Sequence, residues 1–130
     1  MNLLRGRIGQ RGDRNVARFA GGDLGLPRRA ASMLGRYIGS EVIVGIRPED
    51  LYESAAAGDS TQFEYLPVRV DAVEPLGAET LLMVTLDGSD TEMIARIGRD
   101  TALRRGERVR LALDTAAIHL FDPATTKAIA

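Results

Sequence analysis

The sequence predicts a mainly β protein: a closed antiparallel barrel or sandwich with one or two short helices. Short apolar segments of strand length recur along the chain, and clusters of Gly, Asp and Pro separate them. With 130 residues, 45% of them hydrophobic, the chain can form one domain with its own core. About eight or nine strands are expected, at residues 3–8, 16–20, 24–26, 42–46, 63–73, 81–86, 92–97, 109–113 and 118–121.

The N-terminal third contains the first strands. Residues 3–8 have apolar ends and a charged middle, and residues 16–20 stop at the turn cluster 21–23. Residues 24–26 could return as the second strand of a hairpin. Residues 42–46 are fully apolar, which predicts a buried strand.

One helix is expected between Pro27 and Gly39. Pro27 suits the first turn of a helix, and Gly39 suits the position just after its end. Five residues at helical spacing form an apolar stripe: Ala30, Met33, Leu34, Tyr37 and Ile38. Because such a stripe needs a surface to bury it, we expect this helix to cover an open end or flank of the barrel.

The C-terminal half contains the longest alternating segment, residues 63–73. One face would carry Phe63, Tyr65, Pro67 and Arg69, and the other Leu66, Val68, Val70 and Ala72. Residues 87–90 and 104–107 have the composition of turns between strands. The small polar segment 54–61 is expected to be a mobile loop.

Residues 44–51 combine a strand with a turn. Pro48 cannot donate to a strand ladder, so the strand must stop there. Pro48 also suits the first position of a helical turn, and Glu49 and Asp50 suit its positive end. This segment therefore predicts a strand that ends in one capped turn.

The composition excludes several kinds of chemistry. Without cysteine, the chain has no disulfide, thiolate or Cys-based zinc site. His119 is the single histidine and Lys127 the single lysine, and a Gly-rich phosphate-binding loop is missing. We therefore expect no catalytic, cofactor-binding or metal-binding residues. Nucleic-acid binding is not expected either, because the net charge is −1 and aromatic residues are few.

Charge is unevenly distributed between the two halves of the chain. Residues 1–50 carry nine arginines against five acidic residues, whereas residues 51–130 carry eight basic residues against thirteen acidic ones. A positive face on the N-terminal half is one interpretation, and scattered solvated arginines are the other.

Five segments, in this order along the chain, resemble the accessory domain that follows the ATPase domain in importer-type ABC transporter subunits of the maltose/glycerol-3-phosphate class. They are residues 1–8, 45–49 (G-I-R-P-E), 73–80 (V-E-P-L-G-A-E-T), 105–111 and 120–125 (L-F-D-P-A-T). Each segment alone is weak evidence for this resemblance, but the order and spacing of the five segments together are strong evidence. That domain is a small OB-like or MOP-like antiparallel β-barrel, also called a transport-associated OB or TOBE-like domain.

The resemblance implies that residues 1–130 form a single regulatory domain. The Walker A, Walker B and signature motifs of the ATPase half are missing, so the chain could be an excised domain, a truncated subunit or a free-standing copy. By itself it would not be an enzyme. ATP and magnesium would belong to the ATPase domain of a parent subunit that imports a sugar, glycerol-3-phosphate or a polyol.

The resemblance also implies partners and a location. The partners are a second copy of the subunit, the ATPase domain, the transmembrane permease subunits reached through it, and a regulatory protein. The location is the cytoplasmic face of the cell membrane. Interface candidates within the family-like segments are Arg47, Pro48, Glu49, Gly77, Glu79, Thr80, Phe121 and Asp122.

Several of these residues also have an expected structural role. Gly77 can take the positive φ of a turn, and Asp122 can begin an Asx-type turn before Pro123. Phe121 can cap the end of the barrel. Arg47 and Glu49 could pair with each other, or with a partner.

Two other functions remain open. A small oxyanion- or sugar-binding module is one, since residues 2–8 faintly resemble the first strand of related barrels in molybdate systems. Arg5 or Arg7 could then hold an anion by charge-assisted hydrogen bonds. An enzyme of unknown type is the other, but no set of residues indicates a reaction.

Overall fold

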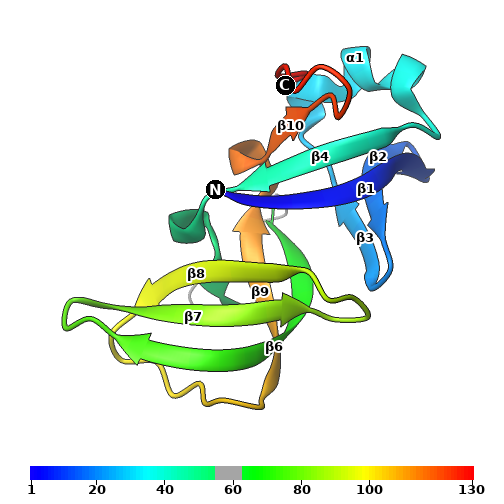
Figure 1. Cartoon of the computed structure of the whole chain (residues 1–130). Coiled ribbons are helices and arrows are strands. Elements are labelled where there is room, and N and C mark those ends of the chain that lie inside the picture. Colours follow the sequence, from blue (N-terminus) through cyan, green and yellow to red (C-terminus); the bar gives the residue numbers. More distant parts are fainter. Residues whose placement is uncertain (55–62) are drawn as a thin grey trace.

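Two five-stranded antiparallel sheets make up the protein, as the computed structural model shows for residues 1–54 and 63–130 (Figure 1). The first sheet has the order β10–β4–β1–β2–β3, with β1 at Asn2–Arg11, β2 at Arg14–Phe19, β3 at Gly22–Gly25, β4 at Glu41–Ile46 and β10 at His119–Phe121. The second sheet has the order β5–β9–β6–β7–β8, with β5 at Tyr52–Glu53, β6 at Phe63–Pro75, β7 at Glu79–Leu86, β8 at Glu92–Gly98 and β9 at Arg108–Asp114.

This arrangement confirms the mainly β, OB-like fold class. Among the described residues there are ten strands, one more than the upper estimate, because the two-residue strand β5 is too short to leave a pattern in the sequence. The expected hairpin is present as β2 and β3, and most of the expected loop at 54–61 lies outside the described residues. No helix in residues 1–54 or 63–130 is long and apolar enough to cross a membrane.

The expected helix is broken into three short pieces: η1 at Arg28–Ala30, α1 at Ala31–Leu34 and η2 at Gly35–Tyr37. Ala30 and Leu34 are fully buried, as the stripe predicts. The prediction is wrong for Ile38, which follows η2 with an extended backbone and stays 47% exposed. Gly39 has a φ of +84°, the conformation expected just after a helix. Figure 1 shows these pieces beside the first sheet, at one end of the molecule.

A β-bulge in β6 changes which residues face the core. The pairing of β6 with β7 shifts between Val70 and Ala72, so Asp71 is the extra residue. After this shift Val73 packs against the core and Ala72 lies opposite Met83 on the outer face. The expectation that Ala72 faces inward with Val70 is therefore wrong, because strict alternation holds only where the ladder is regular.

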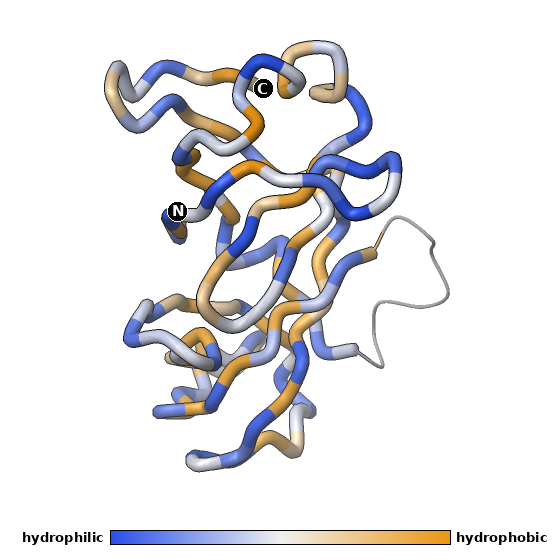
Figure 2. The backbone as a smooth tube through the Cα atoms, turned by 90° about the vertical axis from the view of Figure 1, so that its right-hand side faces the viewer, coloured by the Kyte–Doolittle hydropathy of each residue, from blue (hydrophilic) through white to orange (hydrophobic). Residues whose placement is uncertain are grey.

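One hydrophobic cluster joins both sheets. Its largest fully buried members include Leu4 and Ile8 of β1, Leu82 of β7 and Leu111 of β9. Figure 2 shows hydrophobic positions recurring along the strands of both sheets. Since each sheet buries one face against this cluster, the two sheets stabilise each other.

Specific polar contacts also connect the sheets. The Asn2 side chain donates to the carbonyl oxygen of Ile94 at 2.8 Å and accepts from the Ile94 N–H at 2.8 Å, so it joins β1 to the outermost strand of the second sheet. Glu64 of β6 accepts from the Gly25 N–H at 2.7 Å and from Arg11 at 2.9 Å.

Candidate functional site

The segment 44–51 folds as the sequence predicts. β4 ends at Ile46, Arg47 is extended, and Pro48–Asp50 form the single turn η3 with Pro48 in its first turn. The Asp50 N–H donates to the Arg47 carbonyl at 2.9 Å, and the side chain of Leu51 is fully buried. Anchored in this way, the turn leaves Arg47 and Glu49 exposed.

Arg47 and Glu49 do not pair with each other. Six ion pairs connect the described residues, and neither side chain takes part in one. Two roles were expected for these residues, pairing with each other or contact with a partner. The structure does not show the first, so contact with a partner is the role that stays open.

The second family-like segment approaches the first around a surface hollow. Gly77, with a φ of +91°, allows the turn between β6 and β7, and the Leu76 N–H donates to the Glu79 carbonyl at 2.8 Å. Thr80 is buried at the start of β7. The hollow has a volume of about 660 Å³ and is lined by Glu49, Leu51, Tyr52, Glu53, Ala78, Glu79, Arg96, Ile97, Gly98, Asp100 and Thr101.

Negative charge dominates this hollow. Of the described residues that line it, four carry carboxylates, Glu49, Glu53, Glu79 and Asp100, and one, Arg96, is cationic. Arg96 lies 3.2 Å from Glu79 and pairs with it. This excess of negative charge suits a cationic segment of a partner. Among the described residues, no group of three His, Cys, Asp or Glu could hold a metal ion.

The other candidate residues, Phe121 and Asp122, lie in a different part of the molecule. Phe121 belongs to β10 in the first sheet, away from the turn at Gly77 (Figure 1). Asp122 begins the expected Asx-type turn, since its carboxylate accepts from the Ala124 N–H at 2.8 Å. The structure therefore brings Glu49 and Glu79 to one hollow and separates them from Phe121 and Asp122.

Gly45 connects three of the family-like segments. A Cβ added at this position would lie 2.5 Å from the Met1 sulfur and 2.9 Å from the Phe121 ring. The missing side chain lets Met1 and Phe121 lie directly on β4. Phe121 therefore covers the outer face of the first sheet at Gly45.

Arg5 and Arg7, the residues expected to hold an anion, already have partners. Arg5 donates to Glu41 at 3.0 Å, and Arg7 donates to the carbonyl of Gly39 at 3.1 Å. Arg18, on the same shallow hollow, donates to the carbonyl of Gln10 at 2.6 Å. Among the described residues, Arg5 and Arg18 of this hollow are thus paired with the carboxylates of Glu41 and Asp23, whereas Arg7 is bonded to a backbone carbonyl alone.

No catalytic arrangement appears among the described residues. His119 is half-buried on β10, opposite Gly45. Asp71 has a pKa held below its ordinary value by a hydrogen bond from Thr85 and by Arg69 beside it. Asp71 is the extra residue of the β6 bulge, and its contacts with Thr85 and Arg69 are consistent with a structural role.

The sequence reasoning missed two features that shape the surface. Asn2 was overlooked as a link between the sheets. In the alternation along β1 it lies on the same inward face as Leu4 and Ile8. Arg96 was not recognised as the partner of Glu79, because the two residues become diagonal neighbours only through the pairing of β7 with β8, in which Arg96 lies opposite Leu81 and Glu79 opposite Gly98. No local pattern in the sequence signals such a contact.

The fold and the site define the class of the protein: an OB-like β-barrel domain with an acidic surface hollow. A solved structure of the cytoplasmic molybdate-binding protein ModG, with molybdate bound, has the same fold. It has a TM-score of 0.68 and 16% identity, and the match covers 94% of this chain and 96% of that one.

Comparisons of the sequence establish the family. Residues 44–121 match the TOBE domain family, and residues 1–51 match the MalK OB fold domain family. The chain belongs to the TOBE domain family.

Similar curated proteins are ATP-binding subunits of importers. The sn-glycerol-3-phosphate import ATP-binding protein UgpC of Chromohalobacter salexigens is 42% identical over 84 residues, which are 65% of this chain and 22% of UgpC. The sulfoquinovosyl glycerol transport ATP-binding protein SmoE of Agrobacterium fabrum is 36% identical over an alignment of 133 positions that covers 99% of this chain and 33% of SmoE. The trehalose/maltose import ATP-binding protein MalK of Thermococcus litoralis is 39% identical over 95 residues, which are 72% of this chain and 25% of MalK. The chain therefore spans about a quarter to a third of the length of these relatives.

Proposed function

We propose that this chain is the regulatory and dimerisation domain of the ATP-binding subunit of an ABC importer for a sugar, glycerol-3-phosphate or a polyol. One observation carries the proposal. Family matches run continuously from residue 1 to residue 121, across both sheets, and the similar curated proteins are import ATP-binding subunits. The chain itself performs no reaction in this proposal, and ATP and magnesium are bound by the ATPase domain of the subunit.

The proposed partners follow from this role. They are a second copy of the subunit, the ATPase domain, the permease subunits reached through it, and a regulatory protein. The complex lies on the cytoplasmic face of the membrane.

A domain exchange tests the proposal. The region of C. salexigens UgpC that matches this chain is replaced by residues 1–130, and pairing of the subunits, ATP hydrolysis and glycerol-3-phosphate uptake are measured in the assembled transporter. The hybrid is expected to retain all three activities. A UgpC without its matching region and a UgpC carrying an unrelated OB barrel serve as controls. The proposal is contradicted if subunit pairing, ATP hydrolysis and glycerol-3-phosphate uptake are no higher in the hybrid than in these controls.

We propose that the acidic hollow contacts the ATPase domain. Support comes from the exposed Glu49 and Glu79, which two separate family-like segments bring to one place. In the hybrid, Glu49→Arg combined with Glu79→Arg should reduce ATP hydrolysis coupled to transport, because four carboxylates facing a cationic segment become two. Glu41→Arg, an exposed change on the first sheet, is the matched control. A contact at the hollow is contradicted if Glu41→Arg lowers transport-coupled ATP hydrolysis as much as the double change does.

The oxyanion-binding alternative has weaker support. Arg5 pairs with Glu41, Arg7 donates to the Gly39 carbonyl, and the likeness to ModG at 16% identity concerns the fold alone.

A further inference from the structure

The last residues of the chain enclose a small hollow against the helical pieces between β3 and β4. One wall of this hollow comes from α1 and η2, and the other from the segment that follows β10. Its volume is about 290 Å³, and the lining residues are Met33, Arg36, Tyr37, Asp122, Thr125, Lys127, Ala128 and Ile129. We call it the C-terminal hollow. It includes two residues of the family-like segment 120–125, which has no residue in the acidic hollow.

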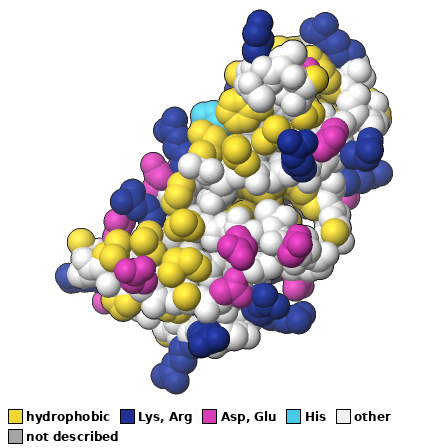
Figure 3. Space-filling model, in the orientation of Figure 1, with side chains coloured by type: hydrophobic (Ala, Val, Ile, Leu, Met, Phe, Trp, Pro, Cys, Tyr) yellow, Lys and Arg dark blue, Asp and Glu magenta, His cyan; other side chains and the backbone are white. Residues whose placement is uncertain are grey.

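Two cationic side chains line the C-terminal hollow from opposite walls. Arg36 belongs to η2 and Lys127 to the segment after β10, and neither takes part in an ion pair among the described residues. The guanidinium carbon of Arg36 lies 5.7 Å from the centre of the Tyr37 ring, a cation–π contact that favours a position beside the ring. Figure 3 shows basic side chains gathered at the end of the molecule where α1 and the C-terminus lie.

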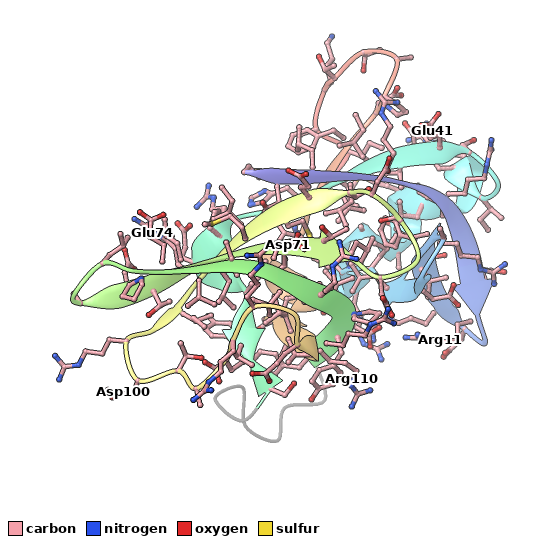
Figure 4. All side chains as sticks on the ribbon, turned by 60° about the horizontal axis from the view of Figure 1, so that its bottom comes forward. Arg11, Glu41, Asp71, Glu74, Asp100 and Arg110 are labelled. Atoms are coloured by element: carbon pink, nitrogen blue, oxygen red, sulfur yellow. The ribbon has the colours of Figure 1, made fainter. Side chains whose placement is uncertain are left out.

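The acidic side chain in the lining is already used by its own turn. The Asp122 carboxylate accepts from the Ala124 N–H at 2.8 Å and from the Thr125 N–H at 3.4 Å. Other carboxylates lie elsewhere, since Figure 4 shows Glu74 and Asp100 beside the second sheet, away from the segment after β10. With two cations against one carboxylate, the lining has a net positive charge and suits an anion.

The turn that carries Lys127 contains a strained residue. Thr126 has a φ of +58°, which is unfavourable for a β-branched side chain. Two backbone hydrogen bonds close the turn: the Asp122 N–H donates to the Lys127 carbonyl at 2.9 Å, and the Thr126 N–H donates to the Asp122 carbonyl at 2.7 Å. Thr125 and Lys127, on either side of the strained residue, both line the hollow. Strain of this kind is common in segments that hold a ligand.

We propose that the C-terminal hollow binds a small phosphate monoester. The phosphate group lies between Arg36 and Lys127, whose side chains donate charge-assisted hydrogen bonds to its oxygens. The hydroxyl of Thr125 is a further donor. Met33 and Ile129, both half-buried, form an apolar wall for the carbon part of the ligand. A hollow of about 290 Å³ is near the lower end of the usual range for ligand sites, so it fits one small molecule.

A titration of residues 1–130 with sn-glycerol-3-phosphate, followed by amide NMR shifts at constant ionic strength and neutral pH, tests the proposal. Saturable shifts are expected at Arg36, Tyr37, Thr125 and Lys127. Inorganic phosphate should shift the same amides with lower affinity, because it does not reach the apolar wall, and glycerol should shift none of them. The two phosphate probes therefore separate binding of the phosphate group from binding of the ester.

Variants assign the site to its two cations. Arg36→Gln and Lys127→Gln should each weaken binding of sn-glycerol-3-phosphate by about tenfold, since each removes a charged donor. Thr126→Gly, which relieves the positive φ, should also weaken binding, because the turn then holds Lys127 less firmly opposite Arg36. Arg28→Gln is the matched control: Arg28 is an exposed arginine of η1 that does not line the hollow, and its loss should leave binding unchanged.

The same amide spectra show whether each variant keeps the fold, so a loss of binding is not confused with misfolding. The proposal is overturned if the wild type shows no saturable shifts, or if the shifts centre on Arg5 and Arg7 of the first sheet. It is also overturned if Arg36→Gln and Lys127→Gln bind as well as the wild type. The inference is independent of the importer role, on which the UgpC hybrid reports separately.

Discussion

Asn2 connects the two sheets through a single amide side chain. It is 8% exposed, and its two hydrogen bonds to Ile94 use the N–H and C=O groups that the last strand of a sheet would otherwise turn to solvent. An amide is suited to this position because it offers one donor and one acceptor side by side.

Asn2→Ala should therefore lower the free energy of unfolding by about 1–3 kcal/mol, since it leaves both groups of Ile94 without these partners. Urea unfolding measures the change. Asn15→Ala is the matched control, because the side chain of Asn15 makes no hydrogen bond among the described residues. Equal losses for the two variants would argue against a role for the Asn2 amide.

Asp71 makes stability depend on pH in a defined direction. Its pKa lies below its ordinary value of 3.8, first because Thr85 donates a hydrogen bond to it and then because of Arg69. A group with a lowered pKa in the folded state stabilises the fold above the unfolded pKa, and this contribution is lost as the pH falls through the folded pKa.

The wild type should thus be more stable than Asp71→Asn at neutral pH, and the difference should shrink as the pH falls from about 5 to about 3. Urea unfolding of both proteins across this range measures the difference. A difference that stays constant with pH would show that the Asp71 carboxylate is not the cause.

At the scale of single residues, the sequence predicted conformations better than contacts. Positive φ at Gly77 and Gly39 and the Asx-type turn at Asp122 were all predictable, because each follows from the chemistry of one residue. The pairs Asn2–Ile94 and Glu79–Arg96 depend on which strands become neighbours, and the local pattern does not contain that information.

At the scale of elements, the turn between β6 and β7 depends on the conformational freedom of Gly77. Its φ of +91° is unfavourable for residues with a Cβ, while no atom lies within 4 Å of where a Cβ would be. The cost of a substitution here is thus conformational and not steric.

Gly77→Ala should lower the free energy of unfolding by about 1 kcal/mol, and Gly77→Asn should cost less because Asn tolerates positive φ better. Thermal unfolding of the three proteins gives the order of stability. Gly98→Ala, where φ is not positive and space is also open, should change stability little. The same stability for wild type and Gly77→Ala would contradict this account.

Regular alternation explains why most strands were predictable. β4, β7, β8 and β9 begin and end within two residues of the expected positions, because apolar runs and turn residues define them. The β6 bulge could not be predicted, since one extra residue leaves the composition of the strand unchanged while it reverses the faces of Ala72 and Val73. The helical segment breaks at Gly35, a poor helix former with which η2 begins, so Ala30 and Leu34 are buried while Ile38 lies outside.

At the scale of the whole molecule, two turns from different sheets contact each other through glycine. Gly21 lies between β2 and β3, and a Cβ there would overlap the carbonyl oxygen of Asp87 in the turn between β7 and β8. Gly88 of that second turn is also in contact with Gly21. Because the facing atoms of both turns belong to the backbone, a change of side-chain rotamer cannot relieve an overlap between them.

Gly21→Ala should accordingly destabilise the protein by about 1–3 kcal/mol, the usual cost of forcing extra volume into a packed site. Gly35→Ala, in open space at the start of η2, should be neutral or slightly stabilising. Chemical denaturation compares the two. A neutral Gly21→Ala would show that the sheets can separate at these turns without cost.

The position of β10 has a consequence for synthesis of the chain on the ribosome. Residues 119–121 return to pair with β4, more than 70 residues earlier, and the N–H of Leu120 is bonded to the carbonyl of Ala130. The first sheet therefore lacks its edge strand β10 until residues 119–121 have been translated and have left the ribosome. Deletion of residues 119–130 should consequently loosen β4, which is made more than 70 residues before β10.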